Sequence, residues 1–167
     1  GLIVVDRTVA GEYENYTTPE QTVPNQPLSH PWESCITMGN SWSYVPGDKY
    51  KSANEIVNLL VKIVSRGGNL LMNIGPGPDG DWDPTAYNRL ADIGKWMAIN
   101  QEGIYNSVPV APYSENNVYY TQSENGKSVY AFVTSATENV TIPATLTLHL
   151  QNAKQVKSVK LLGVSDK

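Results

Sequence analysis

Apolar residues in the first part of the chain fall into two kinds of pattern. Short apolar runs at residues 2–5 and 69–74 predict strands that are buried on both faces, and residues 32–38 predict a further short strand. Two longer segments, 53–66 and 83–100, repeat their apolar residues at the spacing of an α-helix. Strands that alternate with helices in this way predict a parallel α/β sheet or barrel.

Each predicted helix has its own end signals. Ser52 is followed three residues later by Glu55, which matches a capping box, and the pair Gly67-Gly68 ends that helix. Asp83-Pro84 begins the second helix, because proline is well tolerated at the first helical position. The apolar residues at helical spacing are Ile56, Leu59, Leu60, Ile63 and Val64 in the first helix and Leu90, Ile93, Trp96 and Met97 in the second.

After Tyr105 the pattern changes to short segments of period two. Such segments, separated by turn residues such as Glu124-Asn125-Gly126, predict a small antiparallel β domain. The predicted strands are residues 118–121, 128–133, 145–150 and 156–162. The chain is therefore expected to be α/β followed by all-β, with an α/β domain over residues 1–106 and a β domain over residues 107–167.

A polar loop follows the first predicted strand and extends from Asp6 to about Pro31. Loops of roughly 25 residues without secondary structure are uncommon in compact domains and are functional or disordered. This loop carries three carboxylates, Glu12, Glu14 and Glu20, directly after a core strand, where α/β barrels build their active sites. Because glycoside cleavage needs two carboxyl groups, the loop can supply at least one of them. The alternative is a solvated acidic loop.

The basic and aromatic residues nearby have two interpretations each. Arg7, at the end of the first strand, either contacts sugar hydroxyls or a carboxylate, or forms a structural salt bridge with Asp6. Trp32, Glu33 and Trp42 lie on the next predicted strand and in its loop. A tryptophan there either stacks on the apolar face of a sugar or packs in the core.

Composition narrows the range of partners. Ten Tyr and four Trp against one Phe suit sugar binding, although β-rich domains of other functions share this balance. The net charge of −4 without a basic patch argues against nucleic acid, and no apolar run approaches the roughly 20 residues of a membrane helix. Cys35 is the only cysteine and His30 and His149 lie far apart, so neither a disulfide nor a metal site is predicted. No cofactor is predicted, because the Gly-rich residues 75–80 lack the Gly-Lys-Ser/Thr ending of a phosphate loop.

Several short motifs occur together in residues 1 to about 106. They are Val5-Asp6-Arg7, Thr18-Pro19-Glu20, Trp32-Glu33-Ser34-Cys35, Gly39-Asn40-Ser41-Trp42-Ser43-Tyr44, Ser65-Arg66-Gly67-Gly68-Asn69-Leu70-Leu71-Met72-Asn73-Ile74-Gly75-Pro76, Gly94-Lys95-Trp96 and Gly103-Ile104-Tyr105. In type and order this set resembles glycoside hydrolase family 29, the α-L-fucosidases. The form of residues 12–21 is similar to the subgroup that acts on branched α-1,3 and α-1,4 fucosides.

The resemblance implies a fold, a mechanism and a set of site residues. The implied fold is an irregular (β/α) barrel followed by a C-terminal β-sandwich. The implied reaction is retaining hydrolysis, with an Asp of an earlier barrel strand as nucleophile and a later Glu as acid/base. The resemblance assigns the acid/base role to Glu20, with Glu33 as the alternative, and implies that Arg7 contacts fucose and that Trp42 packs against the sugar's C6 methyl group. The remaining expected substrate contacts are Glu14, Tyr16 and Trp32.

The resemblance also implies the partners of the chain. The expected substrate is a fucosylated oligosaccharide or glycoconjugate, and the expected location is secreted, periplasmic or lysosomal. The sequence begins at Gly1 inside a predicted strand and lacks the early barrel strands with their nucleophile. We therefore expect the C-terminal part of a fucosidase, partnered by the N-terminal part of the same enzyme and inactive alone. The alternative is that residues 107–167 form a carbohydrate-binding or purely structural β-sandwich without catalytic function.

Overall fold

The computed structural model describes residues 1–7, 11–137, 144–151 and 153–164. Its helices and strands are, in chain order, β1 (Val5–Asp6), β2 (Tyr16–Thr17), β3 (Glu33–Thr37), α1 (Ala53–Val64), β4 (Asn69–Asn73), α2 (Pro84–Asn100), β5 (Ser107–Glu115), β6 (Val118–Ser123) and β7 (Val129–Val133). Short 3₁₀ helices are η1 (Gln101–Gly103) and η2 (Ala153–Gln155).

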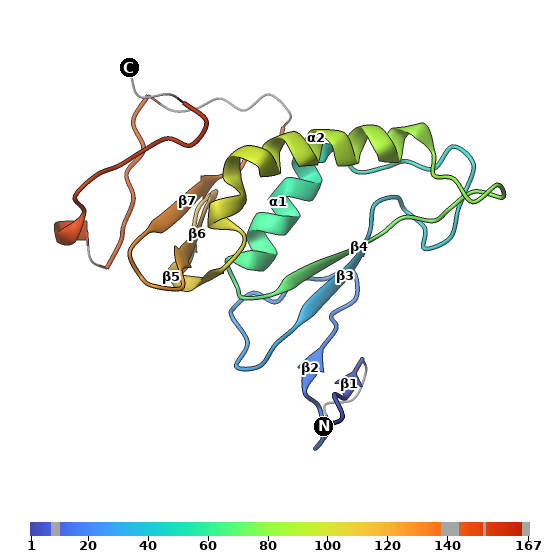
Figure 1. Cartoon of the computed structure of the whole chain (residues 1–167), viewed down its shortest axis with the longest axis horizontal. Coiled ribbons are helices and arrows are strands. Elements are labelled where there is room, and N and C mark those ends of the chain that lie inside the picture. The colour runs from blue at the N-terminus through green and yellow to red at the C-terminus, as the bar shows by residue number, and fades with distance from the viewer. Residues whose placement is uncertain (8–10, 138–143, 152, 165–167) are drawn as a thin grey trace.

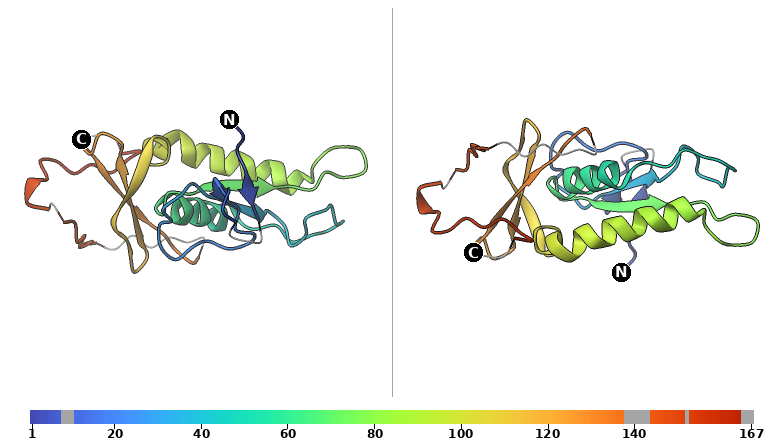
Figure 2. Two further views of the ribbon diagram at one scale, coloured as in Figure 1. Left: turned by 90° about the horizontal axis from the view of Figure 1, so that it is seen from below. Right: turned by 90° about the horizontal axis from the view of Figure 1, so that it is seen from above.

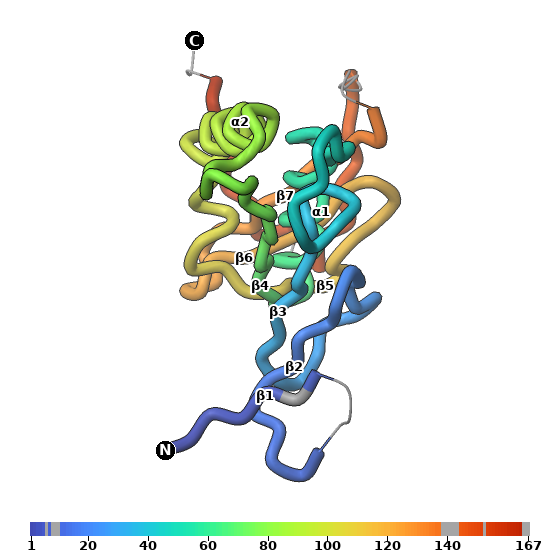
Figure 3. Tube along the Cα trace, turned by 90° about the vertical axis from the view of Figure 1, so that its right-hand side faces the viewer, coloured from blue at the N-terminus to red at the C-terminus, as the bar shows by residue number. Residues whose placement is uncertain are grey.

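These elements are arranged in layers. The helices α1 and α2 lie on one side of the β3–β4 pair, and the β1–β2 pair lies beyond the β3 edge, on the side of β3 opposite to β4 (Figure 1). The view turned by 90° shows the same succession of strands, β4, β3, β2 and β1, toward the N-terminus (Figure 3). The sheet β5–β7 lies at one end of the helices, and the loop between β4 and α2 extends at the opposite end (Figure 2).

The strands of the first part of the chain are parallel. β1 pairs with β2, and β3 pairs with β4 along its full length. Within the described residues, two isolated parallel bridges continue this pairing: Thr17 of β2 bridges Trp32, just before β3, and Glu20 bridges Cys35 in β3. The predicted parallel α/β arrangement is therefore present, and within the described residues it forms an open array rather than a closed barrel.

Both predicted helices are confirmed, with the predicted caps. The Ser52 side chain accepts a hydrogen bond from the Glu55 N–H at 3.2 Å, and the Glu55 carboxylate accepts one from the Ser52 N–H at 2.7 Å. At the start of α2, the Asp83 carboxylate accepts from the Thr85 N–H at 2.8 Å. Hydrogen bonds from Ser52 and from Thr85 hold the pKa of the two capping carboxylates, Glu55 and Asp83, below the ordinary range. Among the described residues, neither helix has the length and apolarity that a membrane span requires.

The core lies between the helices and the two sheets. It consists of three apolar clusters, each of which draws residues from different elements. Their buried members are Trp32, Ile36 and Ile63 in the first, Met38, Ile56 and Ala86 in the second, and Val61, Ile104 and Phe132 in the third. Side chains alternate along a strand, so the packing of Ile36 against α1 turns Glu33, Cys35 and Thr37 to the opposite face of β3.

The prediction that the first and fourth strands are buried on both faces is wrong. In β4, Leu70 and Met72 pack toward the helices, whereas Leu71 is 47% exposed on the other face. Of the strand predicted at residues 2–5 only Val5 lies in a strand, β1, and Leu2 and Ile3 before it are 87% and 75% exposed. The physical reason is that, within the described residues, no second layer packs on this side of the parallel strands.

The antiparallel part is smaller than predicted. The strands expected near residues 118–121 and 128–133 are confirmed as β6 and β7, which form a three-stranded sheet with β5. The strands expected at 145–150 and 156–162 are wrong, because the described residues there contain no strand and Val159 is 85% exposed. Period-two alternation yields a strand only where a neighbouring edge accepts its hydrogen bonds. The predicted sandwich is therefore a single sheet in the described residues.

The turn between α1 and β4 generates a stability prediction. A Cβ atom at Gly68 would collide with indole carbons of Trp32, which is 1% exposed and has no space to move. Gly68→Ala is therefore expected to lower the free energy of unfolding by about 1–3 kcal/mol, measured by urea denaturation. The matched control is Gly94→Ala in α2, where a Cβ meets nothing within 4 Å. It is expected to raise stability by about 0.5–1 kcal/mol, and equal effects of the two substitutions would contradict the collision.

Candidate active site

The segment after β2 runs alongside β3. It carries Glu20 onto the face of β3 that points away from the helices, which is called the uncovered face because no helix or sheet of the described residues packs on it, although Cys35 and Thr37 themselves are buried. The Cys35 N–H donates to the Pro19 carbonyl at 3.1 Å, and the Gln21 N–H donates to the Cys35 carbonyl at 2.9 Å. Residues paired across parallel strands point to the same side, so the Glu20 side chain shares a face with Cys35. Glu33 lies two positions before Cys35 and points the same way. The structure thus brings the two acid/base candidates to one face of β3.

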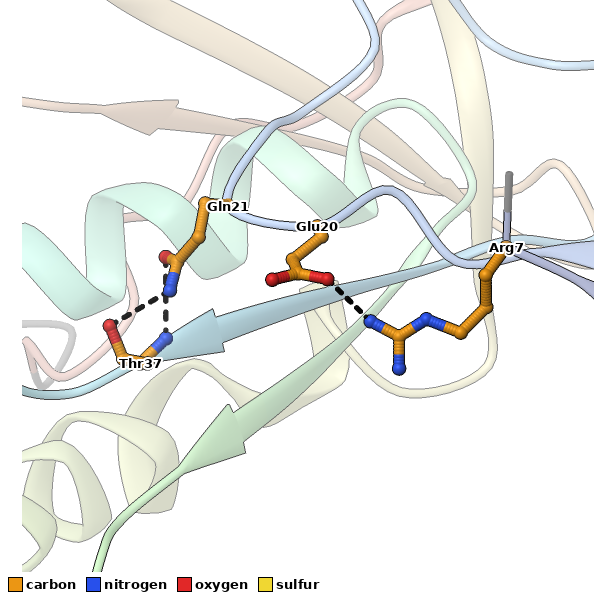
Figure 4. Close-up of polar contacts among 4 residues, drawn as sticks. All are labelled: Arg7, Glu20, Gln21 and Thr37. Atoms are coloured by element: carbon orange, nitrogen blue, oxygen red, sulfur yellow. Dashed lines mark hydrogen bonds and ion pairs between the residues drawn. The ribbon is translucent and has the colours of Figure 1, made fainter. Parts of the chain in front are cut away.

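An ion pair joins Arg7 to Glu20. The Arg7 Nη2 atom lies 2.6 Å from Glu20 Oε2, and the two side chains are 52% and 49% exposed (Figure 4). The predicted partnership of Arg7 with a carboxylate is therefore observed, and the carboxylate is Glu20. The alternative partner, the side chain of Asp6, lies outside the described residues.

The residues that follow Glu20 are tied to the carboxyl end of β3. Gln21 donates from Nε2 to Thr37 Oγ1 at 3.0 Å and accepts from the Thr37 N–H at 3.4 Å (Figure 4). The Ser34 hydroxyl donates to the Thr22 carbonyl at 2.6 Å. These bonds come from both faces of β3, so the backbone around Glu20 is held at a defined position beside the strand.

Glu14 and Tyr16 each contact a residue that is distant in the sequence. The Glu14 carboxylate is 13% exposed and lies 3.4 Å from Nε2 of His30, which also lies 3.2 Å from the Thr17 hydroxyl. Tyr16 is half-buried in β2, where it pairs with Val5. Sequence reasoning set His30 aside, and its position twelve or more residues from both partners gave no local signal of this contact.

The two tryptophans predicted as sugar contacts have different environments. Trp32 is 1% exposed and donates its indole N–H to the Arg66 carbonyl at 3.2 Å, which agrees with the core-packing interpretation. Trp42 is 40% exposed and lines a hollow of about 470 Å³ beside β3 and β4. The hollow is also lined by Cys35, Leu71, Met72, Asn73, Ile74, Trp82 and Leu90.

Trp82 is a lining residue that sequence reasoning missed. It lies in the loop after β4, as Trp42 lies in the loop after β3, and its ring contacts Tyr87 at 5.5 Å between centroids. The signal that could have identified it is the same for both residues: a tryptophan in a loop that follows a parallel strand, where barrels build their sites.

The two carboxylates on the uncovered face differ in their partners. Glu20 is paired with a cation, whereas Glu33 makes no side-chain hydrogen bond or ion pair within the described residues and is less exposed. The described part of the chain contains no group of three or more His, Cys, Asp or Glu side chains that could hold a metal ion.

The comparisons with family models, curated proteins and solved structures agree on one family. Residues 1–102 match the family model described as alpha-L-fucosidase. The chain is 37% identical over 122 residues to an alpha-L-fucosidase of Dictyostelium discoideum, covering 71% of this chain and 26% of the relative. In structure it is similar to alpha-L-fucosidase isoenzyme 1 from Paenibacillus thiaminolyticus, with a TM-score of 0.64, 32% identity and coverage of 68% of this chain and 28% of that one.

A second similar structure is described as a reaction intermediate of its own enzyme. It is an alpha-L-fucosidase from Bacteroides thetaiotaomicron, described as a trapped covalent intermediate with 2-fluoro-fucosyl fluoride in a Glu-to-Gln mutant. The TM-score is 0.61 and the identity 28%, over 66% of this chain and 28% of that one. Our chain spans about a quarter to a third of the length of the curated relatives it matches.

The exposed ion pair generates a prediction that separates a structural from a functional role of Arg7. Pairs between half-exposed side chains contribute about 0–1 kcal/mol to stability. Arg7→Met is therefore expected to leave the free energy of unfolding within about 1 kcal/mol of the parent protein, measured by urea denaturation at low salt. A larger loss would mean that the pair holds the loop in place and that Arg7 is structural.

Proposed function

This chain belongs to the α-L-fucosidase family, and from that premise we propose that it is part of a retaining enzyme that removes terminal α-linked L-fucose from glycans. The observation that carries the proposal is the placement of Glu20 and Glu33 on one uncovered face of β3, with Arg7 beside them. All three residues lie inside the stretch that matches the family model. Two carboxyl groups acting on one sugar are the machinery of glycoside cleavage.

The proposed reaction has two steps. An Asp nucleophile, supplied by the rest of the enzyme, attacks C1 of fucose while a carboxylic acid of this chain gives its proton to the leaving oxygen. The resulting carboxylate then takes a proton from water, and that water attacks C1, releases fucose and restores both carboxyl groups. The covalent intermediate described for the Bacteroides thetaiotaomicron neighbour supports the two-step route.

We assign the nucleophile to an N-terminal part of the same enzyme, which we propose covers the exposed face of the parallel strands. Three observations support this partner. β4 has a second edge that pairs with no strand in the described residues. Leu71 of β4 is exposed on this side, and Leu2 and Ile3 before β1 are exposed as well. The curated relatives are three to four times as long as the matched segment, so they contain the additional chain that such a partner requires.

Two residues are candidates for the acid/base. The family motif favours Glu20, which lies in Thr18-Pro19-Glu20. The contacts favour Glu33, because the Glu20 carboxylate is already bonded to Arg7, whereas Glu33 makes no side-chain hydrogen bond or ion pair within the described residues. If Glu33 is the acid/base, the Arg7–Glu20 pair is left to bind the hydroxyl groups of the sugar.

The finer specificity belongs to the same proposal. Trp42 is proposed as the apolar wall for the C6 methyl group of fucose, since it is exposed in the hollow beside β4. An aromatic wall leaves the additional hydroxyl of other hexoses without a partner, which disfavours them. The form of residues 12–21 supports a preference for α-1,3 and α-1,4 linkages.

A test of the function compares the complete enzyme with the 167-residue chain alone. The complete enzyme is expected to release fucose from α-1,3- and α-1,4-linked oligosaccharides faster than from α-1,2- and α-1,6-linked ones, and the isolated chain is expected to release none. The first-formed sugar should be the α-anomer by NMR, as retention requires. Initial formation of the β-anomer would exclude the two-step mechanism, and activity of the chain alone would exclude the division of the site.

A second test assigns the acid/base. In the complete enzyme, alanine at the acid/base should slow fucosides with poor leaving groups far more than activated aryl fucosides, because only the former need protonation. Azide should restore turnover in that variant, since an anionic nucleophile needs no base. We expect one of Glu20→Ala and Glu33→Ala to show both effects. Glu12→Ala, an exposed carboxylate of the same loop, is the control and should show neither. If neither candidate shows them, the acid/base is neither Glu20 nor Glu33.

A further inference from the structure

Arg66 is a buried cation at the junction of four segments. It follows α1 directly, is 7% exposed, and all its hydrogen-bond partners within the described residues are neutral oxygens. Burial lowers the pKa of Arg66 from its ordinary value, because the charge has lost much of its water. A buried charge is costly unless its donors are satisfied, so this arrangement has to be held by the surrounding structure.

One side of the guanidinium holds the helix and the loop that carries Glu20. Nη1 donates to the Lys62 carbonyl at 3.0 Å, at the carboxyl end of α1, where the helix dipole favours a cation. Nε donates to the Asn25 carbonyl at 3.1 Å. Asn25 lies three residues beyond Thr22, the last point at which this loop is bonded to β3, so Arg66 provides the next anchor of the same segment.

The other side of the guanidinium reaches the antiparallel sheet. Nη2 lies 3.5 Å from the Ser114 hydroxyl of β5, and the guanidinium carbon lies over the ring of Tyr119 in β6, 5.5 Å from its centroid. A cation over an aromatic ring is attracted by its negative face, most strongly where water is excluded. The sheet therefore contributes contacts to the same side chain that anchors the loop.

The backbone of Arg66 supports the second carboxylate as well. Its carbonyl accepts the indole N–H of Trp32 at 3.2 Å, and Trp32 immediately precedes Glu33. The same residue thus anchors the loop that carries Glu20 and the side chain next to Glu33.

We propose that Arg66 is a positioning residue for the acid/base. In this proposal Ser114 of β5 and Tyr119 of β6 hold the Arg66 guanidinium in place, and the antiparallel sheet thereby affects catalysis. The inference rests on the proposed fucosidase function. It assigns the antiparallel sheet a role in the geometry of the active site, beyond support of the α/β part. Arginine suits this position, because its planar fork donates in several fixed directions at once, whereas lysine carries a compact charge.

The test uses the complete enzyme and compares fucosides with good and poor leaving groups at a temperature where each variant is folded. Arg66→Met is expected to lower kcat for the poor leaving group at least tenfold more than for an activated aryl fucoside, with KM changed less than kcat. Arg66→Lys should recover part of the loss, and Tyr119→Phe, which keeps the ring, should have less effect than Tyr119→Leu. If Arg66→Met does not fold, Arg66→Lys and Tyr119→Leu provide the same comparison.

The control separates positioning from loss of stability. Ile56→Ala removes buried volume in the cluster of Met38, Ile56 and Ala86, against which neither Tyr119 nor Trp32 packs, and should lower the melting temperature without changing the leaving-group dependence. Arg66 variants that are destabilised but keep the parent ratio of the two substrates would overturn the inference and leave the fucosidase function intact. Absence of fucosidase activity in the parent enzyme would instead overturn the proposed function, and the inference with it.

Discussion

The pairing of β3 along both of its edges is the constraint on which the rest of the structure depends. β4 pairs with one edge, and the backbone around Glu20 pairs with the other at Cys35. A strand paired on both sides cannot rotate, so its side chains alternate strictly between two faces. One face provides Ile36 for the core under α1, and the other presents Glu33 next to Glu20. The alternation of side chains along β3 therefore separates the face that packs in the core from the face that carries the two carboxylates.

Arg66 shows how distant parts of the chain are held in this arrangement. Its donors reach α1, the loop and the antiparallel sheet, and each accepting atom is a neutral oxygen. A carboxylate partner would concentrate the interaction in one direction, whereas several neutral acceptors and a ring spread it over three elements. The free-energy cost of burying the charge is offset by contacts from all three elements, so the buried guanidinium is most stable when all of them are assembled.

The uncovered side of the parallel strands has the properties of an interior. Leu71 exposes apolar surface there, and the hollow beside β4 is lined mainly by apolar side chains. The chain corresponds to about a quarter to a third of its curated relatives. An exposed strand edge with apolar neighbours associates readily with further strands. The proposed N-terminal partner would cover this side and bring its nucleophile to the two carboxylates.

The sequence by itself determined the elements whose signals are local. The capping box at Ser52 and the proline at the start of α2 specify both helices within one turn of chain, and the motifs around Glu20, Glu33 and Trp42 indicated the family. The alternation along β6 and β7 was sufficient for those strands because each finds a neighbouring edge.

Only the tertiary structure decided the relations between distant residues. It paired Arg7 with Glu20, turned Glu20 and Glu33 to one face, and buried Trp32 while leaving Trp42 exposed. It also left residues 156–162 without a strand, although their sequence predicted one. The physical reason is that register, burial and strand pairing depend on which edge or layer is available nearby, and that information is not carried by any one segment.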